Sequence, residues 1–133
     1  MAEAELSLTL AHEQYLAAIN ANDLDGVLKM LTDDAIYLPP HEPAVSGKEA
    51  IRPWLSGYFS AFRTHWEKET LELVSAGDWA IEFAAERVTD TPIGGGEAIE
   101  DVCKGIIVYR RQADGSWMVA RDMWNSDLPA PTP

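Results

Sequence analysis

The sequence predicts a single α+β domain, with three helices in its first half and a meander of long antiparallel strands in its second. Apolar residues recur at helical spacing up to residue 62, and from residue 65 they alternate as in strands. Turn sequences at 77–78 and 113–115 separate strands, so neighbouring strands should pair as hairpins. We expect the long sheet to curve around the helices.

The first two expected helices occupy residues 5–21 and 24–31. In the first helix the apolar residues fall near one stripe, as in a helix that packs one face on a core: Leu8, Ala11, Tyr15, Ala18 and Ile19. Asn22 and Asp23 interrupt this pattern, and the Asp23 carboxylate can cap the second helix.

A brief strand is expected over residues 33–40, and it should end at its two prolines because proline cannot donate to a strand ladder. A loop over 41–47 then leads to a third helix over 48–62. The apolar stripe of this helix consists of Ile51, Trp54, Leu55, Tyr58 and Phe62. Pro53 must lie in its first turn or kink it.

Four long strands follow, joined by two tight turns and a turn-rich connection over 91–97, at residues 65–76, 79–90, 98–112 and 116–126. The proline-rich residues 127–133 should form a flexible tail. Because no linker or internal repeat interrupts the chain, we expect residues 1–133 to form one domain.

The composition and net charge of the chain limit the kinds of partner that it is expected to bind. The chain has 133 residues, is 47% hydrophobic and carries a net charge of −12, which disfavours binding to nucleic acid or to anionic membrane surfaces. The N-terminal sequence lacks a signal segment, so we expect a cytoplasmic protein. The single Cys103 cannot form an internal disulfide, and no His, Cys and carboxylate spacing predicts a metal site or a cofactor.

The last strand carries a carboxylate where alternation predicts an apolar face. Its sequence "MVARDMWNSD" (118–127) places Asp122 on the same side as Met118, Ala120 and Trp124. A carboxylate on such a face is a candidate general base, because desolvation raises a carboxyl pKa towards neutrality. The alternative is a structural ion pair, with Arg87 as the candidate partner, and such a pair would bind a polar ligand group instead.

Three segments together resemble the NTF2-like superfamily, and within it the SnoaL-like and ketosteroid-isomerase-like group. They are "YLAAINANDLDGVLKMLTDDAIYLPP" (15–40), "SGKEAI" (46–51) and the "DG-W" hairpin (114–117). The resemblance covers about residues 8–126. It implies a cone in which a curved, mainly antiparallel sheet and three helices enclose one deep apolar pocket, and it implies a dimer through the outer sheet face.

The resemblance also suggests roles for individual positions. Tyr15 stands where the steroid isomerases have a tyrosine that donates to the substrate oxyanion. Their catalytic base corresponds to Pro39 and their second acid to Ile107, so the steroid isomerase reaction is not expected here. In the polyketide cyclases of the group the acid/base aspartate comes from a late strand, which matches Asp122.

Further residues are expected around the pocket. The resemblance places Trp54, Ala120 and Trp124 on its wall, and Tyr58 can stack on a flat ligand or belong only to the core. His41 lies in the loop that should rim its mouth. Val119, Arg121 and Met123, with Trp117 beside the hairpin, are expected on the outer face, where an apolar patch would favour a homodimer.

Two hypotheses for function follow. The first is a cofactor-independent isomerase or cyclase that transfers a proton on a small apolar carbonyl compound, with Asp122 as acid/base and Tyr15 as oxyanion donor. The second is a non-catalytic module that uses the same pocket to bind a ligand, or the same fold to associate. The absence of an aspartate at Pro39 favours the second, and the carboxylate at Asp122 favours the first.

Overall fold

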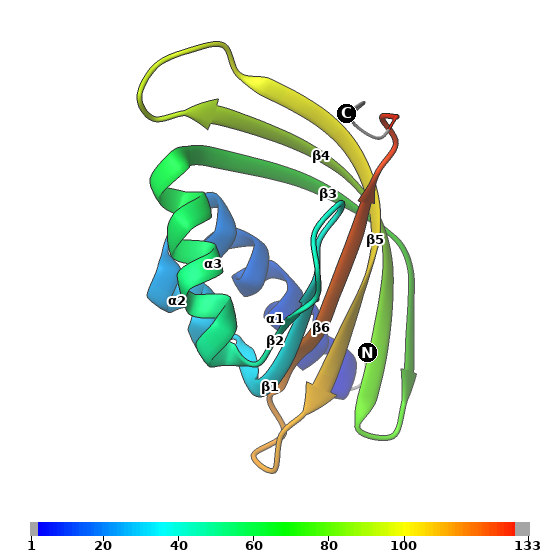
Figure 1. Ribbon diagram of the computed structural model, residues 1–133. Helices are drawn as coiled ribbons and strands as arrows, with labels where there is room; N and C mark the ends of the chain where they lie inside the picture. The colour runs from blue at the N-terminus through cyan, green and yellow to red at the C-terminus, as the bar shows by residue number, and fades with distance from the viewer. Residues whose placement is uncertain (1–2, 130–133) are drawn as a thin grey trace.

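The computed structural model describes residues 3–129 and contains a six-stranded sheet and three helices. The sheet curves around the helices (Figure 1). The elements in chain order are α1 (Glu3–Asn20), α2 (Leu24–Lys29), β1 (Leu31–Leu38), β2 (Val45–Ser46), α3 (Lys48–Ala61), β3 (Phe62–Ala76), β4 (Trp79–Pro92), β5 (Ile99–Arg111) and β6 (Trp117–Ser126). The predicted α+β class is therefore confirmed, with element ends that differ from the prediction by a few residues and one unexpected short strand, β2.

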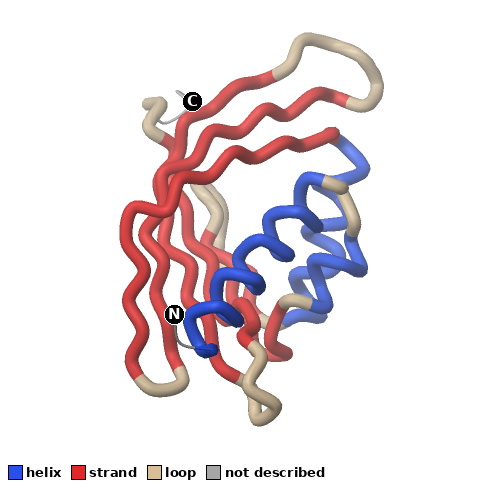
Figure 2. Tube along the Cα trace, turned by 180° about the vertical axis from the view of Figure 1, so that it is seen from behind, coloured by secondary structure: helices blue, strands red, loops and turns tan. Residues whose placement is uncertain are grey.

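The sheet has the order β2-β1-β6-β5-β4-β3. All neighbouring strands are antiparallel except β1 and β6, which pair in parallel because the chain returns to β1 only after the whole meander. The helices cover one face of the sheet, and β3, β4 and β5 bend over them at one end (Figure 2). Because of this curvature, the helices and the inner face of the sheet form two opposed walls.

Local sequence explains where the helices begin. The Asp23 side chain accepts a hydrogen bond from the backbone N–H of Gly26 at 3.0 Å, which caps α2 as predicted. Gly47 precedes α3 with a φ of 92°, a left-handed backbone conformation that suits glycine. Pro53 lies inside α3 rather than in its first turn.

The core lies between the inner face of the sheet and the helices. Its fully buried side chains come from every layer, and the largest apolar ones are Tyr15, Tyr109, Leu31, Ile51 and Ile107. The predicted stripes of the first and third helices supply much of it, because their apolar positions face the sheet.

A bulge in β6 corrects the predicted face pattern. Val119 pairs with Tyr109 and Arg121 with Val108, so Ala120 is an extra residue in β6. Before the bulge Trp117 and Val119 are 3% and 0% exposed and face the core, and after it Asp122 does. The expectation that Trp117 and Val119 lie on the outer face is therefore wrong, and Met118 does not share a face with Asp122.

The predicted tail begins with anchored residues. The backbone N–H of Asp127 donates to the carbonyl of Val102 at 2.8 Å, and its side chain forms an ion pair with Lys104. Residues 130–133 of that tail lie outside the described residues. No helix among residues 3–129 is long and apolar enough to cross a membrane.

The outer face of the sheet carries an apolar surface. Residues directly opposite each other on neighbouring strands share a face, and the pairing aligns two rows, Val74–Ile81–Val108 and Phe83–Ile106–Met123. Val74, Ile81 and Met123 are 44%, 37% and 37% exposed. We propose that this surface, which does not depend on Trp117 or Val119, forms the interface of a homodimer.

Phe83→Glu should convert this dimer to a monomer, because a carboxylate in the middle of an apolar interface would be buried without a partner. Sedimentation velocity at micromolar concentration measures the change. Ile93→Glu is the control, since Ile93 is 58% exposed in the β4–β5 connection. A wild-type protein that sediments as a monomer would refute the proposal.

Candidate active site

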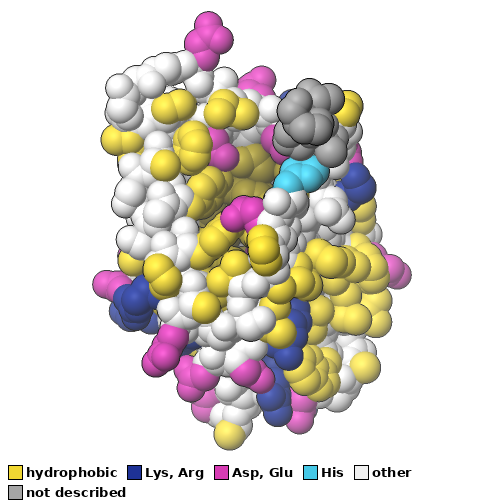
Figure 3. All heavy atoms as spheres, in the orientation of Figure 1, with side chains coloured by type: hydrophobic (Ala, Val, Ile, Leu, Met, Phe, Trp, Pro, Cys, Tyr) yellow, Lys and Arg dark blue, Asp and Glu magenta, His cyan; other side chains and the backbone are white. Residues whose placement is uncertain are grey.

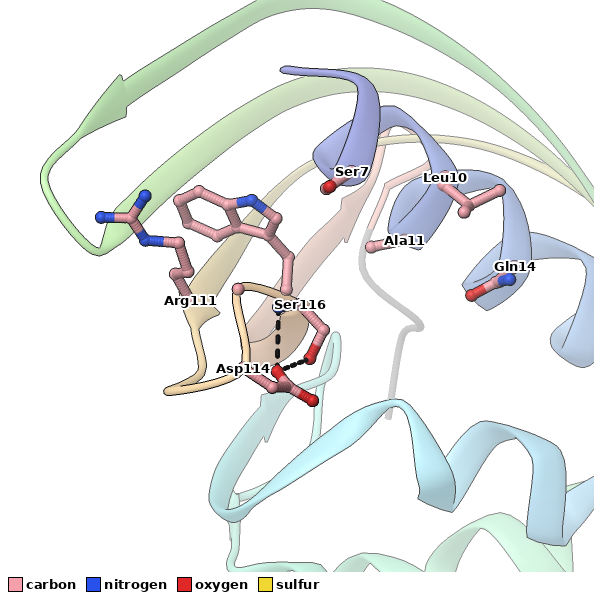
Figure 4. Close-up of a pocket in the computed structure, with 9 residues that line it drawn as sticks. Ser7, Leu10, Ala11, Gln14, Arg111, Asp114 and Ser116 are labelled. Atoms are coloured by element: carbon pink, nitrogen blue, oxygen red, sulfur yellow. Dashed lines mark hydrogen bonds between the residues drawn. The ribbon is translucent and has the colours of Figure 1, made fainter. Parts of the chain in front are cut away.

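Two hollows with different chemistry lie at different places in the molecule. The larger, about 460 Å³, is an open depression between α1 and the β5–β6 hairpin (Figure 4). Its two charged side chains already have partners: Asp114 accepts hydrogen bonds from Ser116 within the turn, and Arg111 forms an ion pair with Asp78 at 2.9 Å. This depression is a gap between α1 and the hairpin, and its charged side chains are already paired with protein groups.

The second hollow, here called the inner chamber, lies between the helices and the sheet. It measures about 40 Å³ and is lined mainly by apolar side chains, namely Leu16, Ile19, Trp54, Leu55, Tyr58, Phe59, Trp66 and Trp124. Its other lining residues are the polar or ionisable Tyr15, Tyr37, Lys68, Glu86 and Asp122. The chamber therefore places five polar or ionisable side chains against an aromatic wall.

An outer hollow of about 280 Å³ adjoins the inner chamber. The two share four aromatic side chains, Trp54, Tyr58, Trp66 and Trp124. These rings contact each other edge-on or tilted, with Trp54 and Trp124 centroids 6.0 Å apart. In the space-filling view the surface is hollowed over hydrophobic side chains, with acidic side chains at the edge (Figure 3). The aromatic residues thus separate the chamber from the outside.

Asp122 lies at the base of the chamber and is 9% exposed. The Tyr15 hydroxyl donates to its Oδ2 at 2.7 Å, and Tyr37 Oη lies 2.7 Å from Tyr15 Oη. Because the Tyr15 proton is used on Asp122, the Tyr37 hydroxyl must be the donor to Tyr15 in this arrangement. The three groups form a chain of hydrogen bonds that ends on the carboxyl.

Burial raises the pKa of Asp122 above its ordinary value. The Lys68 ammonium and the Tyr15 hydrogen bond act in the opposite direction, and the charge of Glu82 adds to the rise. The direction is the one expected of a desolvated base. Burial also raises the pKa of Tyr15 well above its ordinary value, with Asp122 adding to the effect, so the Tyr15 hydroxyl stays protonated.

Glu86 is a second carboxyl in the chamber that the sequence analysis did not identify. It is 7% exposed, and burial, together with the charge of Asp122, raises its pKa to about 7. Lys68 opposes this rise. The carboxyl lies over Gly105 of β5, where a Cβ would meet Glu86 Oε1 at 2.8 Å. Glycine at this position gives the carboxyl its room.

A third acid, Glu82, lies next to the chamber and belongs to a separate network. Its carboxylate accepts hydrogen bonds from Thr70 at 2.5 Å and Tyr109 at 2.8 Å, and its two oxygens lie 3.1 and 2.9 Å from His12 Nδ1. Burial acts to raise the pKa of Glu82, but His12, Lys68 and Thr70 together lower it to about 2. Glu82 is therefore a fixed negative charge.

The predicted site residues divide into groups. Five line the inner chamber: Tyr15, Trp54, Tyr58, Asp122 and Trp124. Pro39 lines the outer hollow, whereas Ala120 and Ile107 are buried in the core without lining either space. His41 is exposed in its loop and lines neither.

Arg87 lies outside the chamber, and the suggested Asp122–Arg87 pair does not form. Arg87 is exposed and pairs across the sheet with Glu67, because alternation turns Glu86 inward and Arg87 outward. The cation that faces Asp122 comes instead from β3, at Lys68. The sequence around Lys68 is rich in charged residues, which is typical of a solvent-exposed strand. The sequence therefore contains no signal that the Lys68 side chain is buried.

Comparison with solved structures identifies the fold. A ketosteroid isomerase-like protein from Erwinia carotovora atroseptica SCRI1043 is 27% identical, with a TM-score of 0.87 over 97% of this chain and 100% of that one. A proposed dehydratase of the NTF2-like family from Streptomyces avermitilis is 14% identical, with a TM-score of 0.82 over 92% and 96% of the two chains. A proposed scytalone dehydratase from Novosphingobium aromaticivorans is 13% identical, with a TM-score of 0.83 over 96% and 89%. The molecule thus has the fold of these ketosteroid isomerase-like and NTF2-like proteins.

The model of the SnoaL-like domain matches residues 12–120, which is most of the chain. This protein therefore belongs to the SnoaL-like domain family, as the sequence resemblance indicated. No curated protein matches the sequence. Among residues 3–129, no three His, Cys, Asp or Glu side chains gather in a way that could hold a metal ion.

The raised pKa of Glu86 predicts a specific pH dependence of stability. Folding shifts this pKa from its ordinary 4.5 to about 7, so the folded protein binds more protons than the unfolded chain between these values. The stabilisation is complete below about pH 4.5 and is lost as the pH rises through about 7. Glu86→Gln, which stays neutral, should therefore gain about 2–3 kcal/mol relative to wild type over that range.

Urea unfolding of both proteins at several pH values from about 5 to about 8 measures this difference. Glu69→Gln is the matched control, because Glu69 is an exposed residue of the same hairpin. Parallel stability curves for wild type and Glu86→Gln would contradict the prediction.

Proposed function

We propose that this protein catalyses cofactor-independent proton transfer on a small apolar carbonyl compound, as a SnoaL-like isomerase or cyclase. The observation that carries the proposal is the buried pair of carboxyls, Asp122 and Glu86, on the polar side of an aromatic chamber. Burial raises the pKa of both carboxyls, and the charge of Asp122 raises the pKa of Glu86 further. Pairs of this kind provide one group that accepts a proton and one that returns it near neutral pH.

Asp122 is the proposed base. Among the described residues its only hydrogen bond is the one that Tyr15 donates to Oδ2, which leaves Oδ1 for a substrate C–H. Tyr15, held between Tyr37 and Asp122, orients this carboxyl. The role of oxyanion donor expected from the resemblance would require the Tyr15 hydroxyl to leave Asp122, so we assign Tyr15 to positioning.

The aromatic wall would select the substrate. Trp54, Tyr58 and Trp124 offer ring faces and edges to a flat apolar molecule and exclude water from the carboxyls. The names of the structural neighbours, which include a ketosteroid isomerase-like protein and proposed dehydratases, belong to the same range of reactions. These observations support the reaction class and leave the individual substrate open to screening.

The second candidate is a ligand-holding module without catalysis. The absence of an aspartate at Pro39 favours it. The inner chamber measures about 40 Å³ and drug-sized ligands occupy several hundred Å³, so the aromatic residues would have to move aside for a retained ligand as for a substrate. A module of this kind would retain a small molecule through purification, which mass spectrometry of the denatured protein can detect.

The catalytic proposal predicts that wild-type protein speeds deuterium incorporation from solvent at the α-carbon of small cyclic ketones, followed by NMR. Asp122→Asn should keep the fold and lower this rate by about 100- to 10,000-fold, because the amide cannot accept the proton. Asp33→Asn, at an exposed position on β1, should leave the rate unchanged. A wild-type protein without exchange activity on such a panel, but with a retained ligand, would favour the binding module.

A further inference from the structure

Lys68 of β3 is a buried cation without a hydrogen-bond partner. Its side chain is 2% exposed and lines the inner chamber, and its Nζ makes no hydrogen bond among the described residues. An ammonium has three N–H donors, and leaving them unmet in a low-dielectric site is unfavourable. The structure therefore contains strong donors at the chamber that no protein group uses.

The nearest counter-charge does not meet this need. Glu82 Oε1 lies 3.9 Å from Lys68 Nζ, too far for a hydrogen bond, and its carboxylate already accepts from other groups. The pair is thus balanced in charge but not in hydrogen bonding. Burying the ammonium beside a saturated carboxylate keeps its donors available for another acceptor.

Lys68 also lies close to both carboxyls of the chamber, as a group that binds the reacting substrate must. Lys68 pairs across the sheet with Glu86, its charge acts on both Glu86 and Asp122, and its Nζ lies 5.9 Å from the centre of the Tyr15 ring. A group bound to Lys68 would therefore lie beside both carboxyls. Lys68 and Tyr15 both line the chamber, so the unused donors of the ammonium lie at its wall.

We propose that the Lys68 ammonium binds the substrate's carbonyl oxygen and stabilises it as an enolate. This inference rests on the proposed function and adds to it the residue that holds the developing negative charge. It defines the substrate class as compounds with an enolisable carbonyl attached to a flat apolar group. It also supplies a donor for the oxyanion in a site where the Tyr15 hydroxyl already donates its hydrogen bond to Asp122.

The step balances with the groups present. The Asp122 carboxylate takes a proton from the carbon next to the carbonyl, the C–H electron pair becomes the C=C bond, and the carbonyl π pair moves to oxygen. Lys68 donates hydrogen bonds to that oxyanion. When the substrate carries a C=C bond in the β,γ position, the enolate is a dienolate, and return of the proton from Asp122 to the γ-carbon restores the carbonyl and completes an isomerisation. If protonated Glu86 delivers the proton instead, the proton held by Asp122 passes to Glu86 and resets the site, and no oxidant or reductant takes part.

A phenol that mimics the enolate tests this directly. The probe is 4-nitrophenol, whose phenolate absorbs at longer wavelength than the phenol, added at a pH below its own pKa. Wild-type protein should bind it with the appearance of the phenolate band, because Lys68 favours the anion. Lys68→Met, of similar size and without charge, should weaken phenolate binding by about 10- to 100-fold and remove the band.

Two further variants complete the design. Lys68→Arg keeps the positive charge and should retain the band, so it remains informative if Lys68→Met does not fold. Lys29→Met, an exposed lysine of α2, is the matched control and should bind as wild type does. A wild-type protein that does not bind the probe or binds it only as the neutral phenol, or a Lys68→Met variant that keeps the band, would overturn the proposal.

The outcome separates this inference from the proposed function. Deuterium exchange without phenolate binding would mean that a group other than Lys68 holds the oxyanion. A Lys68-dependent phenolate band without exchange would support an oxyanion-binding site and refute the catalytic proposal.

Discussion

The hydrogen bond between the Tyr15 hydroxyl and Asp122 connects the first helix to the last strand, across 107 positions of sequence, at 2.7 Å. The rest of the chamber is arranged around this bond. It fixes α1 against β6, places a carboxyl in an apolar core and receives support from Tyr37 on β1. A buried carboxyl without such a donor would be far more costly, because an unsatisfied polar group in the core loses its water and gains nothing.

The sheet concentrates ionisable groups on its inner face near the helices. Glu82 and Glu86 come from β4, Lys68 from β3 and Asp122 from β6. The charge of Lys68 lowers the pKa of each of the three carboxyls, yet these carboxyls differ in state. Hydrogen bonds fix Glu82 as an anion, whereas burial favours the protonated forms of Glu86 and Asp122. One fold thus combines the Lys68–Glu82 ion pair with two carboxyls whose pKa values burial raises, which is an arrangement suited to function more than to stability.

The bulge in β6 makes this combination possible. If Ala120 occupied an ordinary position in the ladder, a strand that faces the core with Trp117 and Val119 would turn Asp122 and Trp124 outward, because a shift of one residue reverses every later side chain. With it, the same strand fills the core near the hairpin and lines the chamber further along. Because of the bulge, one strand of ten residues both packs the core, through Trp117 and Val119, and supplies Asp122 and Trp124 to the chamber.

By itself the sequence determined the order and type of the elements, because helical stripes, strand alternation and turn residues are local signals. It also determined that Tyr15, Trp54, Tyr58, Asp122 and Trp124 would share a pocket, although this relied on family resemblance as much as on pattern. Lys68 and Glu86 belong to strand segments with alternating charges that look solvated in sequence. Only the tertiary structure decided that their side chains are buried, because the helices cover the inner face and the pairing of β3 with β4 aligns the two residues. The same pairing turned Arg87 outward, and the bulge turned Trp117 inward, since strand faces depend on register between distant segments rather than on neighbours in the chain.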